Sequence, residues 1–226
     1  HSIVSWDFAV SSIPGWHSTI FAPYFVAGAI FSGSAMVITL MIPLRKFIKG
    51  FSEIITMNAM EGMAKVILFM GMIITCSYIV EFFISAYSGS SHEQSIFWFR
   101  SRGEYSGYFW LMIFCNCIIP LLFWFKRFRT SIRWLFIISI FINIGMWLER
   151  FVIVVTSLAH DFFPSTWGSY HFEWVEVWLT IGSFGWFFFW FLIFLKTLPS
   201  LAISEIKEHE PPPLRNPESF VSATGK

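Results

Sequence analysis

The fold is decided by the stretch Phe141-Ile-Asn-Ile-Gly-Met-Trp-Leu-Glu-Arg-Phe-Val-Ile-Val-Val-Thr-Ser157. It is apolar enough to cross a bilayer, yet it carries Glu149 and Arg150 side by side. Ionised groups at membrane depth are costly, so they are usually paired, face the protein interior and often lie on a proton or ligand path. The stretch therefore predicts a membrane helix that holds either a functional charge cluster or a structural ion pair that fixes helix packing.

Composition indicates a membrane protein. Of the 226 residues, 56% are hydrophobic, 21% are aromatic and only 13% are charged, whereas a soluble domain usually carries about 25% charged residues. The net charge of +1 gives no indication of a nucleic-acid partner. The three cysteines all lie in apolar runs, which favours packing roles over disulfide or metal sites. We predict an all-α polytopic bundle in the bilayer and no metal site.

Five segments reach the roughly 20 residues that a membrane helix needs. We divide the chain into an outer-face segment (1–19), a transmembrane bundle (20–198) and a polar tail (199–226). Lys and Arg concentrate in the connections on one side, so the positive-inside rule predicts that these connections and the C-terminus are cytoplasmic. The predicted spans are Phe21–Leu40, Ala64–Tyr87, Gly107–Phe125, Ile132–Ser157 and Val175–Leu195.

Two of the spans carry charges at matched depth. Glu81 precedes Tyr87 by six residues and Arg150 precedes Ser157 by seven, so each lies roughly 10 Å below the outer rim at 1.5 Å per residue. We expect a Glu81–Arg150 ion pair with Glu149 beside it. Such a cluster leaves one carboxylate without a cation, a group suited to exchanging protons. The alternative is a buried ion pair with a purely structural role.

An acid and a histidine lie among tryptophans before the first span. Asp7 and His17 suit a site that takes protons from a hydrophobic hydroxylated ligand such as a quinol, and Trp6 and Trp16 would bind its ring together with Asp7. The alternative is a helix cap for Asp7 and an interfacial anchor for His17.

Redox-centre motifs are missing from this sequence. No predicted span contains a histidine, so there are no opposed axial ligands for a membrane haem. We find no C-x-x-C-H, no ferredoxin cysteine run, and no Walker or Rossmann glycine pattern. We therefore expect no haem or iron–sulfur cluster on this chain, and any such centres on partner subunits.

Several longer motifs follow one another along the chain. They are Ser5-Trp-Asp-Phe8, Pro14-Gly-Trp-His-Ser-Thr-Ile-Phe21, Pro23-Tyr-Phe-Val-Ala-Gly28, Tyr78-Ile-Val-Glu-Phe82, Tyr87-Ser-Gly89, His92-Glu-Gln94, Met146–Ser157 and Asp161-Phe-Phe-Pro-Ser-Thr-Trp-Gly168. In these motifs the chain resembles the NrfD/PsrC family of membrane subunits, and most closely its ActC branch, the quinol-handling subunits of bacterial alternative complex III.

The resemblance implies a subunit of a quinol-oxidising complex in the bacterial inner membrane. Menaquinol or another quinol would be oxidised near the periplasmic face, and electrons would pass to an iron–sulfur subunit, c-type haem subunits and a cytochrome oxidase. A second NrfD-like subunit is a further expected partner. The family fold has two four-helix bundles plus flanking helices, and this sequence, which begins at His1 without a methionine or signal peptide, matches the second bundle and the last helix.

The resemblance also assigns residues. Asp7 matches an acidic position that borders the quinol pocket, and His17 is a second match. Glu81, Glu149 and Arg150 match polar positions in the second bundle, where a proton path is suggested for such subunits. Two other classes stay open: a secondary transporter, which would show broken helices at corresponding positions of two repeats, and a structural membrane anchor.

Overall fold

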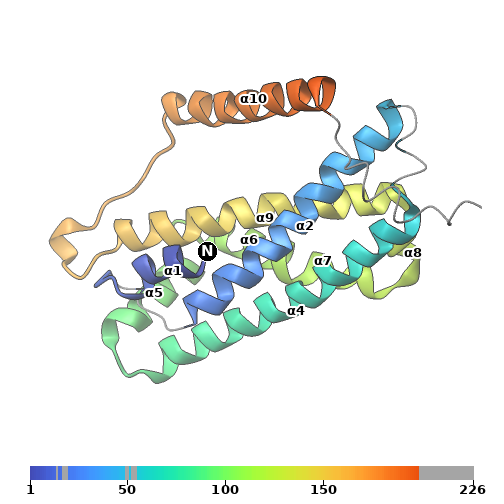
Figure 1. Cartoon of the computed structure of the whole chain (residues 1–226). Helices are drawn as coiled ribbons and strands as arrows, with labels where there is room; N and C mark the ends of the chain where they lie inside the picture. The colour runs from blue at the N-terminus through green and yellow to red at the C-terminus, as the bar shows by residue number, and fades with distance from the viewer. Residues whose placement is uncertain (14, 17–19, 49–50, 52–54, 199–226) are drawn as a thin grey trace, which may run out of the picture. The chain divides into compact units, whose positions relative to one another are not determined.

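The computed structural model describes residues 1–13, 15–16, 20–48, 51 and 55–198, and these residues contain helices and no strand. The chain divides into two units, His1–Tyr170 and His171–Lys226. The first unit is a bundle of long helices (Figure 1). Its elements are α1 (Ser2–Ala9), α2 (Phe21–Phe47), α4 (Met57–Tyr87), α5 (Ser91–Arg102), α6 (Ser106–Ile113), the π-helix η1 (Phe114–Ile118), α7 (Ile119–Leu121), the 3₁₀ turn η2 (Leu122–Trp124), α8 (Lys126–Arg129), α9 (Ile132–Ala159) and the 3₁₀ turn η3 (Pro164–Thr166).

The prediction of an all-α protein with five membrane spans is confirmed. Five helical segments are long and apolar enough to cross a membrane: α2, α4, the composite Ser106–Trp124, α9, and α10 (Trp174–Thr197) of the second unit. Helix α4 begins seven residues before the predicted Ala64, because the Thr56 hydroxyl accepts a hydrogen bond from the Ala59 backbone N–H at 3.3 Å and caps the helix there.

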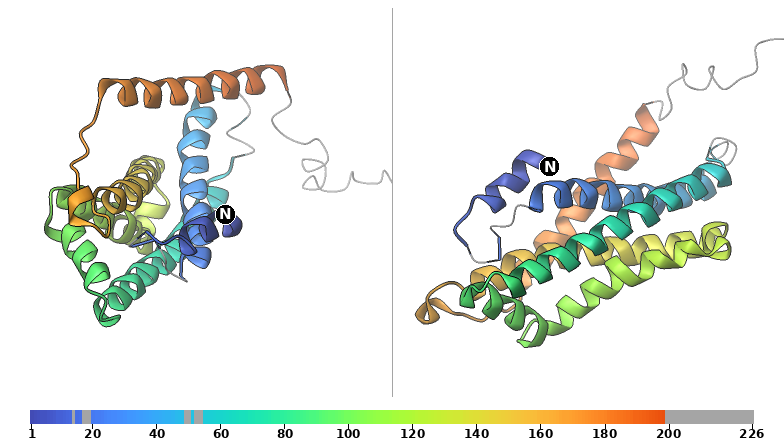
Figure 2. Two further views of the ribbon diagram at one scale, coloured as in Figure 1. Left: turned by 90° about the vertical axis from the view of Figure 1, so that its left-hand side faces the viewer. Right: turned by 90° about the horizontal axis from the view of Figure 1, so that it is seen from below.

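Apolar stripes and a few hydroxyl contacts hold the bundle together. Helix α2 packs against both α4 and α9, and α6 packs against α9 (Figure 2). Phe31 and Ile38, two turns apart on one face of α2, are fully buried. Between α2 and α9, Thr39 Oγ1 lies 2.9 Å from Ser139 Oγ and accepts a hydrogen bond from Asn143 Nδ2 at 3.0 Å. Such bonds supply specific helix contacts where apolar surface alone gives no preference over lipid.

The two ends of the first unit differ in chemistry. Helix α8 lies beside the first turns of α4 and α9 at one end, and α1 and α5 lie at the other (Figure 1). Among the described residues of the first unit, the α8 end carries most of the lysines and arginines. We predict from the positive-inside rule that the α8 end is cytoplasmic and the α1 end is periplasmic.

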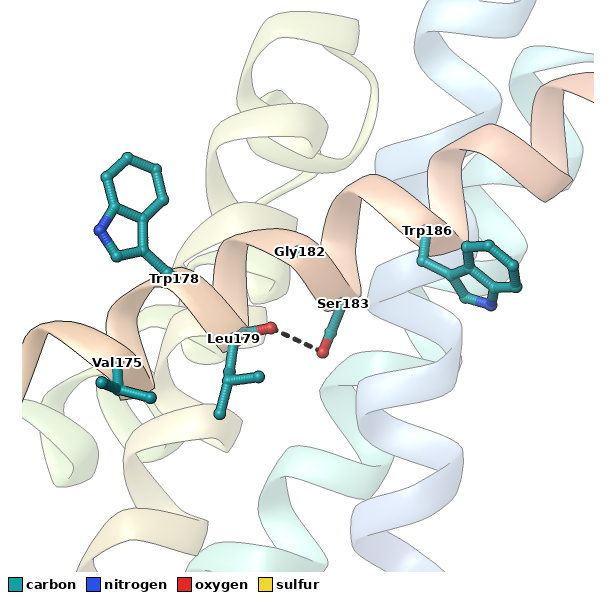
Figure 3. A pocket seen from close by; sticks show the side chains of 6 residues that line it. All are labelled: Val175, Trp178, Leu179, Gly182, Ser183 and Trp186. Atoms are coloured by element: carbon teal, nitrogen blue, oxygen red, sulfur yellow. Dashed lines mark hydrogen bonds between the residues drawn. The ribbon is translucent and has the colours of Figure 1, made fainter.

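The second unit contains one span, α10. A capping box of Glu173 and Glu176 begins the helix, and its side chains are apolar on all sides, which is typical of a helix surrounded by lipid or protein. An open groove runs along one face of α10 (Figure 3). It is lined by Val175, Trp178, Leu179, Gly182, Ser183 and Trp186.

A stacked histidine closes the α1 end of the first unit. His160 directly follows α9 and lies between two rings, with centroid distances of 4.5 Å to Phe99 and 3.8 Å to Trp167. Only 7% of His160 is exposed, and burial lowers the pKa of its imidazole. His160 is therefore packed as a neutral aromatic ring.

This packing predicts a pH-dependent stability. Because the unfolded chain binds a proton at His160 near pH 6.5 and the folded chain only at lower pH, the free energy of unfolding should fall as pH drops below about 6.5. His160→Phe keeps the stack and should flatten this decline in thermal unfolding between pH 7.5 and 5. His92→Phe, which changes an exposed histidine, is the control and should leave the slope unchanged. An unaltered slope in His160→Phe would show that other groups cause it.

Candidate functional site

The most deeply buried acid of the bundle is Glu149 of α9, of which 1% is exposed. The Tyr78 hydroxyl of α4 donates to Glu149 Oε2 at 2.6 Å, and Asn116 Nδ2 of η1 donates to the same oxygen at 3.2 Å. Asn116 Nδ2 also lies 3.0 Å from the Tyr78 hydroxyl oxygen. Glu149 Oε1 has no hydrogen-bond partner within the described residues. One carboxylate oxygen is therefore held by two other elements, and the second is left available.

A local break in the third span positions Asn116. The π-helix Phe114–Ile118 widens the helix there, and single-turn π segments of this kind are frequent at functional sites. Opposite it, α9 carries Gly145, and a Cβ at that position would overlap Asn116 Oδ1 and Cys115 Cβ. The close approach of η1 to α9, and with it the Asn116–Glu149 bond, therefore depends on a glycine.

The second acid of this site, the partly buried Glu81 of α4, pairs with Arg100 of α5. Arg100 Nη1 lies 3.3 Å from Glu81 Oε1, and 6% of Arg100 is exposed. The same guanidinium donates to Thr156 Oγ1 at 2.9 Å and to Ser157 Oγ at 2.8 Å, both in α9. The expected Glu81–Arg150 pair is therefore wrong: the cation for Glu81 comes from the connection between α4 and α6.

Glu81 and Glu149 line one small cavity. Its volume is about 10 Å³, close to the minimum that one water molecule needs. Tyr24, Tyr78 and Arg100 supply its other polar groups. The structure thus brings two of the three predicted cluster residues together, around a space that a single water would fill.

Arg150, the third predicted member, turns to another face of α9. Its guanidinium carbon lies 4.3 Å from the centroid of the Phe25 ring in α2, a cation–π contact. The Phe25 ring in turn contacts Phe8 of α1, with 5.5 Å between centroids. Within the described residues Arg150 forms no ion pair with a carboxylate at hydrogen-bonding distance. Arg150 therefore lies on the α1 side of the bundle.

The segment after α1 docks onto the buried charges. Trp16 Nε1 donates to the Ile153 carbonyl of α9 at 2.8 Å. Gly15 donates its N–H to Glu93 Oε1 at 3.2 Å and has a φ of +80°, a backbone conformation that glycine adopts without strain. A Cβ on Gly15 would lie 3.0 Å from Arg100 Nη2. This segment therefore covers the Arg100–Glu81 pair from the α1 end.

Asp7 lies on an exposed part of α1, where it makes no hydrogen bond or ion pair with the described residues. Trp6 is 59% exposed beside it, whereas Trp16 is half-buried and contacts Phe8 edge to face, with 4.8 Å between ring centroids. The predicted site residue His17 lies outside the described residues. Asp7 and Trp6 are thus open to a ligand or a neighbouring chain.

Sequence reasoning missed three members of this site. Arg100 lies two residues before Arg102 in a connection between two predicted spans, and no local signal distinguishes the two; only the fold buries Arg100. Asn116 lies between two cysteines of an apolar span. A single polar side chain in such a span is the feature that could have indicated its role. Tyr24 lies in the first turn of α2, where a tyrosine is equally typical of a membrane interface.

Five candidate spans, of which the four in the first unit pack around a polar cluster, define a multi-pass integral membrane protein. A family model described as polysulphide reductase, NrfD, matches residues 1–160. The chain therefore belongs to the NrfD family, whose members are membrane subunits of quinone-interacting oxidoreductase complexes and partner with iron–sulfur subunits. A search of curated proteins finds no match.

The Glu81–Arg100 pair gives a testable prediction. Arg100→Gln should leave Glu81 buried without its cation and lower the free energy of unfolding by about 3 kcal/mol or more. Arg102→Gln is the matched control, because the exposed Arg102 only lies 4.6 Å from the centroid of the Trp98 ring, a contact worth about 0.5–1 kcal/mol. Thermal or denaturant unfolding in detergent measures both. An equal decrease in the free energy of unfolding for both variants would show that the Glu81–Arg100 pair does not stabilise the fold more than the exposed contact does.

Proposed function

We propose that this chain is an ActC-like subunit of a quinol-oxidising complex of the alternative complex III type. Quinol binds beside α1 at the periplasmic end, where its oxidation releases two electrons and two protons. The electrons pass to an iron–sulfur subunit, then to c-type haem subunits and a cytochrome oxidase, with a second NrfD-like subunit in the same membrane. The protons pass to side chains of this chain. The observation that carries the proposal is that the α1–α2 connection packs beside Arg100 at Gly15 and bonds to Ile153 of α9 through Trp16.

Asp7 is the base of this proposal. A quinol hydroxyl needs a carboxylate or imidazole within hydrogen-bonding reach when its electrons leave. The Asp7 carboxylate is exposed, while its neighbour Phe8 packs against Trp16 and Phe25 and anchors α1 on the bundle. The exposed ring of Trp6 offers a flat apolar surface for the quinone ring. His17, beyond the described residues, is proposed as a second base.

Arg150 supports binding from the same side. A guanidinium always carries its charge and donates several hydrogen bonds, so it suits a quinone carbonyl or an anionic quinol oxygen. Among the described residues its guanidinium lies over the face of Phe25, a ring that also touches α1. We therefore assign Arg150 to the quinol side and leave the proton-handling role to Glu81 and Glu149.

The proposed proton route runs through the small cavity. Glu149 Oε1 lacks a partner, and the cavity that it shares with Glu81 has room for one water. A water there would join the two carboxylates by hydrogen bonds, so a proton could move between them without side-chain rotation. This arrangement favours proton exchange over a purely structural role for both acids.

The transporter alternative receives less support. It expects interrupted helices at corresponding positions of two repeats. The third span is interrupted around Pro120, whereas α2 passes Pro43 as one helix. Among the described spans, the corresponding second break is therefore missing.

The quinol site is tested by stopped-flow reduction of the c-type haems in the purified complex after mixing with menaquinol analogue. Asp7→Asn should slow haem reduction by about a hundredfold or more, the usual contribution of a general base. Asp161→Asn is the matched control, since Asp161 is the other aspartate of the sequence and lies after α9. Subunit content is checked in each preparation.

Each outcome has a distinct meaning. Slow reduction in an intact Asp7→Asn complex with a fast Asp161→Asn complex supports the site. Equal rates in both would contradict the role of Asp7. A purified complex without haem or iron–sulfur subunits would contradict the alternative complex III assignment.

The proton route is tested separately by Glu149→Gln. Glutamine keeps the shape and accepts the Tyr78 hydrogen bond, but it cannot take up or release a proton. In proteoliposomes we expect quinol-driven proton release to fall at least tenfold, while Glu104→Gln, an exposed glutamate, behaves as the native protein. Unchanged turnover and unchanged proton release in an assembled Glu149→Gln complex would show that Glu149 only packs the bundle.

A further inference from the structure

Basic side chains at the α8 end greatly outnumber acids. The described residues of the last turn of α2, the first turns of α4 and α9, and α8 include a single acid, Glu61. Because like charges repel, this concentration needs anions from outside the described chain. The seven basic residues, which we call the basic end, are Arg45, Lys46, Lys65, Lys126, Arg127, Arg129 and Arg133.

The single acid already has partners. Glu61 Oε1 lies 3.2 Å from Lys65 Nζ and 3.6 Å from Arg129 Nε. Arg129 also donates Nη1 to the Phe123 carbonyl at 3.2 Å. These contacts tie α8 to α4 and neutralise part of the charge. Five of the seven basic residues remain without a carboxylate among the described residues: Arg45, Lys46, Lys126, Arg127 and Arg133.

Three of these five cations are exposed around the α8–α9 corner and lie next to exposed aromatic rings. Lys126 and Arg127 directly follow Trp124 and Phe125, each 62% exposed. Arg133 directly precedes Trp134, which is 41% exposed and packs edge to face on Phe128 at 5.0 Å. Exposed tryptophan rings at span ends lie at the level of the lipid headgroups. The cations of this corner are therefore held at the depth of lipid phosphates.

We propose that the corner of Lys126, Arg127 and Arg133 binds the phosphate of an anionic phospholipid. Lys and Arg beside a membrane surface attract anionic headgroups, and the effect falls off within a Debye length. An acidic protein segment would satisfy the charges equally well, but it would not account for three large aromatic side chains exposed beside them. A phospholipid has both the anionic headgroup for the cations and the acyl chains for the rings.

The test uses the whole membrane complex in nanodiscs of phosphatidylcholine with a small fraction of phosphatidylglycerol. The triple variant K126Q/R127Q/R133Q should retain about tenfold less phosphatidylglycerol per complex after delipidation, measured by native mass spectrometry. Lys65→Gln, which removes an exposed cation already paired with Glu61, is the matched control and should retain the native amount. Raising the salt concentration should reduce retention by the native complex but not by the triple variant.

The outcomes decide the proposal. Equal retention in the triple variant and the native complex would overturn it. Loss of a partner subunit from the triple variant, with phosphatidylglycerol retention unchanged, would also overturn it and would identify the corner as a protein contact. Equal losses in the triple variant and in Lys65→Gln would show that only total charge matters, which contradicts a defined lipid site.

Discussion

The arrangement of the bundle depends on the hydrogen bonds that a glutamate requires in the middle of an apolar core. Glu149 meets this need by accepting hydrogen bonds from Tyr78 of α4 and Asn116 of η1. Because lipid cannot replace these donors, the Glu149 bonds favour one relative register of α4, α9 and the third span. The π-helix and the glycine opposite it on α9 are the local features that make this register possible. Removing either donor would leave Glu149 Oε2 with one hydrogen bond in place of two.

The two halves of the first unit, toward α1 and toward α8, differ in the contacts between their helices. Toward α1, buried charges, tyrosines and a covering segment form a continuous polar region. Toward α8, the helices contact one another through apolar side chains, the Thr39–Ser139–Asn143 contacts and the Glu61–Arg129 ion pair. Our proposals accordingly place ligand chemistry and proton exchange in one half, and lipid binding in the other. This division suits a family whose members meet both quinone and iron–sulfur partners.

Much of this arrangement could be predicted from the sequence. The lengths of the apolar segments predicted the five spans. The energetic cost of charges inside a membrane indicated Glu81 and Glu149 as site residues, and these two line one cavity. The partner of Glu81 could not be predicted, because the sequence is compatible with an ion pair to either Arg150 or Arg100. Only the packing of α5 against α9 brings Arg100 to Glu81. The depth of a residue along a helix can be estimated from residue spacing. The direction of its side chain around the helix axis depends on the helices packed against it, and for this reason the predicted position of Arg150 was wrong.

The depth of Glu149 also has an electrical consequence. It precedes the end of α9 at Ala159 by ten residues, about 15 Å of helix, and this is about half of the roughly 30 Å hydrocarbon thickness. A proton that reached Glu149 from the α1 end would cross about half of the membrane voltage, equivalent to about 1.2 kcal/mol at 100 mV. On the proposed proton route, the protonated fraction of Glu149 would then depend on the membrane voltage. A high membrane voltage would in this way slow quinol oxidation through one side chain.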